Sequence, residues 1–182
     1  EIKDVLVGEV WVCSGQSNME MQLSSAKDAD KAIASCTDPQ MRLYRVAKSS
    51  QDLPVKDTNG AWSKCEPGTA KDFSAIGYYF GRELRRALNV PVGVINASYG
   101  GTWIHAWMSV ALLEADPTTR RDMEAIAAMP EPPIWAKGQN KFGGLYNGMI
   151  APLMPFAIRG VTWYQGESNI GGAYAYRSTF AV

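Results

Sequence analysis

The sequence predicts an α/β fold in which a mainly parallel sheet lies between two layers of helices. Three apolar runs of strand length each end in a short polar loop: Val10–Cys13, Val92–Ile95 and Val161–Tyr164. Helical segments separate these runs along the chain, and strands that alternate with helices favour a parallel sheet covered on both faces. Because ligands bind beyond the carboxyl ends of parallel strands, we expect the three polar loops to cluster at one edge of the sheet.

The first elements follow from short local patterns. The chain begins with an extended lead-in over residues 4–7 and a strand over residues 9–13. Residues 19–37 mix charged and small side chains, which indicates a loop with a short helix. Residues 41–46 alternate in the way of a half-buried strand. Residues 48–72 are polar and rich in turn formers, so we expect a long surface loop there.

A well-defined helix follows this region. Ser74 is a plausible N-cap, and Asn89 and Pro91 stop the helix. Its apolar side chains recur every four residues and share one face; they are Ile76, Phe80, Leu84 and Leu88. The apolar run behind the helix, over residues 90–97, predicts a buried strand.

A second helix is predicted to begin at Asp116, where a capping aspartate precedes a proline in the first turn, and to end near residue 128. After this helix, we expect a loop over residues 134–144 and a short helix over residues 145–154. A strand over residues 158–164 follows, and a last helix starts at Gly172.

Size and composition limit the classes of function. A chain of 182 residues suits one α/β domain with a substantial core. The 18 basic and 18 acidic residues are balanced and form no basic block, which argues against a nucleic acid or an anionic membrane as the main partner. No apolar stretch approaches the roughly 20 residues of a membrane span, and no signal peptide is visible. Because the chain does not begin with Met, the missing signal says little about the compartment.

The cysteines and the histidine do not indicate a metal site. Cys13, Cys36 and Cys65 lack Cys-x-x-Cys spacing, and His105 is the only histidine. We expect free thiols, with a Cys36–Cys65 disulfide as the alternative. The sequence implies neither a metal nor an organic cofactor.

The first polar loop presents a candidate nucleophile. A tight turn after a strand lifts the hydroxyl of Ser17 clear of the sheet, where it can attack a carbonyl carbon. The third loop presents Ser168 in nearly the same pattern, Gly-Glu-Ser-Asn against Gly-Gln-Ser-Asn. A serine in a turn is also a common turn former, and the local sequence does not choose between the two.

Acyl transfer also needs hydrogen-bond donors for the oxyanion. The backbone N–H of Ser17 is one candidate. Gly100 and Gly101 lack side chains, so their N–H groups can approach a substrate oxygen closely. The side-chain amide of Gln165 or Asn169 can supply another donor. Each motif alone has an ordinary structural explanation. The hypothesis of an acyl-transfer site therefore rests on the expected convergence of the three loops at one edge of the sheet.

Three motifs resemble a known family: Gly-Gln-Ser-Asn-Met at 15–19, Tyr-Gly-Gly-Thr at 99–102 followed by Ala-Trp-Met at 106–108, and Trp-Tyr-Gln-Gly-Glu-Ser-Asn at 163–169. They resemble the sialate O-acetylesterases, a branch of the SGNH (GDSL-like) hydrolases that also contains acetylxylan esterases. The resemblance covers nearly the whole chain. It implies a three-layer, flavodoxin-like SGNH fold and a carbohydrate esterase that removes O-acetyl groups from sialic acid or related sugars.

The resemblance also implies residue roles. It makes Ser17 the nucleophile in preference to Ser168, and it makes Gly100 or its neighbour Gly101 an oxyanion donor. It places Gln165 where the wider superfamily has an asparagine donor. The other motif residues are expected at the substrate site; they are Gln16, Asn18, Gly101, Glu167 and Asn169. Among them, Glu167 is expected to organise its loop rather than to take part in the chemistry.

The general base of the family is missing. Relatives take it from an Asp-x-x-His motif near the carboxyl end of the domain, and this chain contains none. We expect residues 1–182 to be the amino-terminal part of a single SGNH-type esterase domain, with the Asp and His beyond Val182. His105 is either a polar residue on the helix after the glycine loop or, as the alternative, an internal base.

Other functions remain open. A catalytically silent carbohydrate-binding relative would keep these loops without a base, and a lipase- or thioesterase-like SGNH hydrolase would have a large apolar groove. The paired acids of a glycosidase are not evident, because nothing sets the spacing of Glu20 and Glu167. The expected partner is an acetylated sugar. The sequence does not indicate an oligomeric state, and the resemblance slightly favours export to the periplasm or the exterior.

Overall fold

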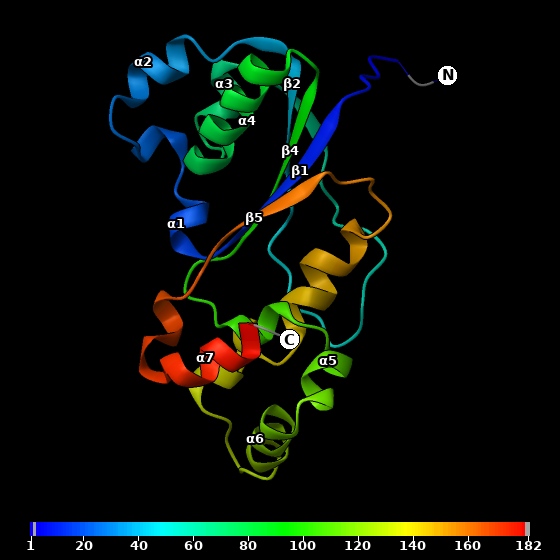
Figure 1. Cartoon of the computed structure of the whole chain (residues 1–182), viewed down its shortest axis with the longest axis vertical. Helices are drawn as coiled ribbons and strands as arrows, with labels where there is room; N and C mark the ends of the chain where they lie inside the picture. The colour runs from blue at the N-terminus through cyan, green and yellow to red at the C-terminus, as the bar shows by residue number, and fades with distance from the viewer. Residues whose placement is uncertain (2, 181–182) are drawn as a thin grey trace. The chain divides into compact units, whose positions relative to one another are not determined.

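The computed structural model describes residue 1 and residues 3–180. These residues form two compact units (Figure 1). Unit 1 consists of three segments, residues 1–46, 59–100 and 156–164. Unit 2 consists of residues 47–58, residues 101–155 and the segment from Gln165 onward.

Unit 1 is built on a mainly parallel sheet. Its described strands are β1 (Glu9–Gly15), β2 (Asp38–Arg45), β3 (Trp62–Cys65), β4 (Val92–Ser98) and β5 (Gly160–Tyr164). Their order across the sheet is β3-β2-β4-β1-β5. β1 pairs in parallel with β4 and β5, β4 pairs in parallel with β2, and β3 pairs with β2 in the antiparallel sense. The predicted α/β class with a mostly parallel sheet is confirmed.

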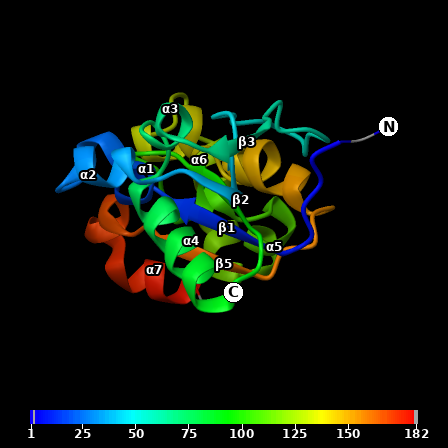
Figure 2. The same ribbon diagram turned by 90° about the horizontal axis from the view of Figure 1, so that it is seen from above.

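The helices of unit 1 include one long helix that covers a face of the sheet. The elements are α1 (Ser17–Glu20), η1 (Leu23–Ser25), α2 (Ala29–Ala34), α3 (Pro67–Ala70) and α4 (Ala75–Leu88). Figure 2 shows α4 lying along this face. The helix approaches the sheet closely at Gly81, because a Cβ there would lie 2.6 Å from Met41 Cε and from Val94 Cγ2.

The ends of α4 confirm the predicted caps. Ser74 Oγ accepts a hydrogen bond from the Gly77 N–H at 3.0 Å. Asn89 ends the helix in the left-handed conformation, with a φ of 52°. The side chain of an N-cap serine satisfies a backbone donor that has no partner within the helix, and Asn tolerates the left-handed region that a helix end requires.

The prediction of a continuous surface loop over residues 48–72 is wrong. This region contains β3 and α3. β3 has only four residues and pairs along one side with β2, so its conformation depends on a distant partner rather than on local sequence. α3 is closed by a capping box in which Glu66 and Thr69 bond each other's backbone N–H groups.

Unit 2 is helical. Its described elements are η2 (Ile104–Trp107), α5 (Val110–Ala115), α6 (Pro117–Ala127), η3 (Ile134–Ala136), η4 (Gly138–Asn140), η5 (Tyr146–Ile150), η6 (Ala151–Leu153), η7 (Glu167–Gly172) and α7 (Ala173–Phe180). Asp116 caps α6 as predicted, since its Oδ2 accepts the Thr119 N–H at 2.7 Å. Among the described residues, no helix has the length and apolar character needed to cross a bilayer.

The carboxyl ends of three strands meet at one edge of the sheet. Gly15, the last residue of β1, pairs with Ser98 at the end of β4 and with Tyr164 at the end of β5. The three polar loops therefore leave the sheet from one edge, as the sequence predicts.

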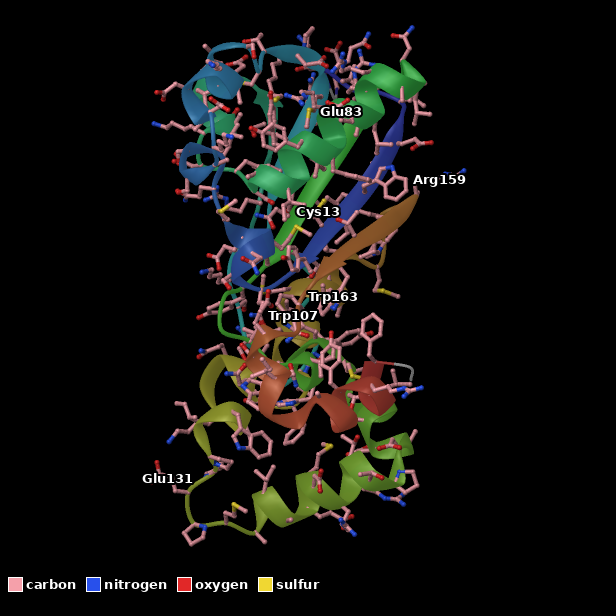
Figure 3. The ribbon with its side chains drawn as sticks, turned by 60° about the vertical axis from the view of Figure 1, so that its left-hand side comes forward. Cys13, Glu83, Trp107, Glu131, Arg159 and Trp163 are labelled. Atoms are coloured by element: carbon pink, nitrogen blue, oxygen red, sulfur yellow. The ribbon has the colours of Figure 1, made fainter. Side chains whose placement is uncertain are left out.

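The three cysteines are buried free thiols. Cys13 lies in β1 (Figure 3), and burial raises the pKa of its thiol to about 11. Burial also raises the pKa of Cys65 to about 12. The Cys65 thiol donates to the carbonyl of Cys36 at 3.2 Å. These groups are therefore protonated at neutral pH and belong to the core.

Candidate active site

The turn after β1 presents Ser17 at the surface. Gly15 has a φ of +140°, and a Cβ on it would clash with the carbonyl oxygen of Tyr164. The next N–H, that of Gln16, donates to the same carbonyl at 2.9 Å. α1 begins immediately afterwards, and Ser17 and Asn18 are exposed while Gln16 is buried. The chain thus leaves the sheet abruptly and exposes the serine at the first position of a helix.

α1 is short, and contacts with the start of α4 hold it in place. Met19 is 1% exposed. Its carbonyl accepts a hydrogen bond from Ser74 Oγ at 2.6 Å, and the carbonyl of Met21 accepts the Ala75 N–H at 2.8 Å. Ser74 therefore caps α4 and anchors α1 at the same time.

The glycine loop after β4 lies against the serine turn. The Tyr99 N–H donates to the carbonyl of Gly15 at 3.0 Å, and the Gly100 N–H donates to Glu20 Oε2 at 2.7 Å. A Cβ on Gly100 would lie 3.3 Å from Ser17 Cβ. Unit 1 therefore brings Ser17, Gly100 and Glu20 together. The sequence did not reveal the role of Glu20 in this contact, although its position three residues after Ser17 places both on one helix face.

The third loop has its own network in unit 2. Gln165 Nε2 donates to the carbonyl of Thr102 and to Asn169 Oδ1, both at 2.8 Å. Asn169 is 6% exposed, and its Oδ1 also accepts the Ile104 N–H at 3.1 Å. Both hydrogens of the Gln165 amide are thus engaged. Gln165 and Asn169 tie this loop to the segment that follows the glycine pair.

The other predicted site residues of this region have distinct environments. Gly101 is exposed and has a φ of +72°, in the left-handed region that favours glycine. Glu167 is exposed at the start of η7, and Ser168 is half-buried in the same element. Ser17 is therefore the more accessible of the two candidate serines.

His105 lies in an aromatic cluster of unit 2. Its side chain is 6% exposed, its Nε2 lies 2.8 Å from the carbonyl oxygen of Asn140, and its ring centroid lies 4.6 Å from that of Phe142. Burial lowers the pKa of His105, while hydrogen bonds with the backbone of Asn140 and Trp135 oppose this shift. These contacts favour a structural role for the neutral imidazole.

The lowered pKa predicts a loss of stability in acid. His105 has a folded-state pKa below the usual 6.5, so the neutral ring stabilises the fold above pH 6.5. This stabilisation is lost as the pH falls below 6.5 and through the folded-state pKa. We expect the urea midpoint to drop between about pH 7.5 and about pH 5.5, and to drop less in His105→Asn. Equal drops in the urea midpoint of the parent and of His105→Asn would contradict a lowered pKa of His105 in the folded protein.

Comparison with known proteins identifies the family. The family model described as "Carbohydrate esterase, sialic acid-specific acetylesterase" matches residues 7–181. The chain belongs to this family of carbohydrate esterases. Membership in the sialic acid-specific acetylesterase family confirms the resemblance that the three motifs predict.

Two sialate O-acetylesterases are similar in sequence to this chain. The sialate O-acetylesterase of Homo sapiens is 35% identical over 189 residues, which cover 98% of this chain and 35% of that protein. The enzyme of the same name from Mus musculus is 33% identical over 199 residues, covering 92% of this chain and 36% of that protein. The chain therefore spans about a third of the length of these relatives.

A solved structure supports the fold. A carbohydrate acetylesterase from Xanthomonas citri is 39% identical and matches with a TM-score of 0.80. The match covers 96% of this chain and 37% of the other. Identity at this level together with this TM-score confirms the fold predicted from the resemblance.

Proposed function

We propose that this chain forms the nucleophile-bearing part of a serine O-acetylesterase that acts on acetylated sialic acid or related sugars. The observation that carries the proposal is Ser17, exposed beyond the carboxyl end of β1 on a turn that requires Gly15. Gly100 lies against this serine. Family membership supports ester hydrolysis, and the names of the relatives support an acetylated sugar as the substrate.

The proposed reaction is a two-step acyl transfer. The hydroxyl of Ser17 attacks the acetyl carbonyl carbon and its proton passes to a general base. The tetrahedral intermediate collapses, the sugar hydroxyl leaves with that proton, and an acetyl group remains on Ser17. Water then attacks the acetyl-enzyme and releases acetate and the free serine. This chemistry requires no cofactor.

The proposed oxyanion donors differ in whether their N–H groups already donate hydrogen bonds within the protein. The Ser17 N–H lies at the first position of α1. Of the glycine pair, Gly100 already donates to Glu20, which favours Gly101 as the second donor. Gln165 is the proposed third donor, and it would have to release the carbonyl of Thr102 or the side chain of Asn169 to bond the oxyanion. Each such donor typically contributes about 3 kcal/mol to transition-state stabilisation.

The proposed base is the histidine of an Asp-x-x-His motif outside these 182 residues. His105 is the internal alternative, and its burial and its bond with the backbone of Asn140 argue against that role. A chain without a base would resemble the catalytically silent, sugar-binding alternative, even if the complete protein is an esterase.

The experiment compares the complete protein with this chain alone. Each is incubated with an O-acetylated sialic acid, and released acetate is measured. In parallel, each is treated with a fluorophosphonate, and the modified peptide is identified by mass spectrometry. We expect the complete protein to release acetate and to be modified at Ser17, and this chain alone to stay near background.

Three other results would contradict the proposal in different ways. Modification of Ser168 in place of Ser17 would reverse the assignment of the nucleophile. Sugar binding without acetate release by the complete protein would favour the silent relative. A strong preference for long-chain acyl esters would favour the lipase-like alternative.

A further inference from the structure

Glu20 makes a contact that connects the two loops of unit 1. It lies three residues after Ser17, at the end of α1, so both side chains share one face of the helix. Its Oε2 accepts the Gly100 N–H at 2.7 Å, across 80 positions of sequence. A hydrogen bond from a backbone N–H to a carboxylate is charge-assisted and about twice as strong as one between neutral groups.

The surroundings leave little freedom in this contact. A Cβ on Gly100 would lie 3.1 Å from Glu20 Oε2 and 3.3 Å from Ser17 Cβ, so the loop backbone is close to both side chains. The preceding amide is held as well, because Tyr99 donates to the carbonyl of Gly15. The buried Met19 and its bond to Ser74 hold α1 itself. Glu20 thus reaches from a fixed helix to the loop.

We propose that Glu20 is a positioning residue for the esterase site: its carboxylate holds the Gly100 N–H and thereby fixes the glycine loop against the Ser17 turn. The inference rests on the proposed function of Ser17. Glu20 has no part in bond making or breaking. Holding Gly100 keeps the loop backbone close to the Ser17 side chain, since a Cβ on Gly100 would lie 3.3 Å from Ser17 Cβ. A displacement of about 1 Å at such a position can lower the rate about a hundredfold.

The test uses the complete protein and three variants. Glu20→Ala removes the acceptor, and Glu20→Gln keeps an acceptor oxygen at the same reach. Glu83→Ala is the matched control, because Glu83 is an exposed carboxylate on α4 (Figure 3). Its side chain pairs with Arg82 and Arg86. We expect Glu20→Ala to lower kcat about a hundredfold with little change in KM. Glu20→Gln should stay within about tenfold of the parent and Glu83→Ala should be unchanged.

A spectroscopic measurement separates positioning from a general loss of stability. In protein labelled with ¹⁵N-glycine, the Gly100 amide proton is expected to resonate downfield and to exchange slowly with solvent. Both properties should be lost in Glu20→Ala, be partly retained in Glu20→Gln and remain in Glu83→Ala. The other glycine amides of unit 1, such as that of Gly81 in α4, should keep their positions.

The outcomes distinguish this inference from the function on which it rests. Full activity in Ser17→Ala would overturn the proposed function itself. If activity depends on Ser17 but Glu20→Ala retains the parent kcat, or leaves the Gly100 amide unchanged, the positioning role is overturned and the esterase proposal stands.

Discussion

Ser17→Ala is expected to lower acetate release by the complete protein at least about a thousandfold, because no acetyl-enzyme forms without the hydroxyl. Residual rate enhancement would come from the oxyanion donors and from substrate binding. The substitution removes one oxygen atom from an exposed residue, so the fold should be unaffected. Initial rates with an O-acetylated sialic acid measure the effect, and circular dichroism checks the fold.

Ser168→Ala is the matched control for this experiment. Ser168 has almost the same neighbours in sequence as Ser17, but it is half-buried in η7 rather than exposed at the end of β1. We expect Ser168→Ala to retain most of the activity. If Ser168→Ala were inactive and Ser17→Ala active, the nucleophile would be assigned to the wrong loop.

Gly15→Ala is expected to cause the largest loss of stability, about 3 kcal/mol or more in the free energy of unfolding. The φ of +140° is strained for any residue with a Cβ, and that Cβ would clash with the carbonyl of Tyr164. This carbonyl accepts the Gln16 N–H, so relief of the clash would break a bond at the serine turn. Urea unfolding followed by fluorescence measures the change.

Gly68→Ala provides the comparison. Gly68 lies in α3 of the same unit, has ordinary helical geometry, and a Cβ there would meet no atom within 4 Å. We expect this variant to be neutral or up to about 1 kcal/mol more stable, because alanine favours a helix. Equal effects at Gly15 and Gly68 would show that the turn does not require glycine.

Much of the fold could be predicted because its signals are local. Ser74 and Asp116 mark two helix starts through side-chain caps that depend only on residues three positions away. The alternation of strands and helices predicts a parallel sheet, and in the structure β1 pairs in parallel with β4 and β5. The exposed position of Ser17 follows from the same local pattern.

The features that sequence reasoning missed depend on distant partners. β3 forms because its backbone pairs with β2. The four residues Trp62–Cys65 are too few for their sequence alone to predict a strand. The bond between Glu20 and the Gly100 N–H requires knowledge of how the two loops meet. The engagement of both Gln165 amide hydrogens is equally non-local, since the acceptors belong to Thr102 and Asn169.

The contact between Glu20 and Gly100 has a consequence for biosynthesis. The two residues are 80 positions apart, so Ser17 leaves the ribosome well before the loop that lies against it. Closing so long a segment is slow relative to local helix formation, and it depends on β4 joining β1. Nascent chains that end before residue 100 should therefore expose Ser17 without a formed site, and the serine should become reactive only after the central strands have paired and the proposed base has been added.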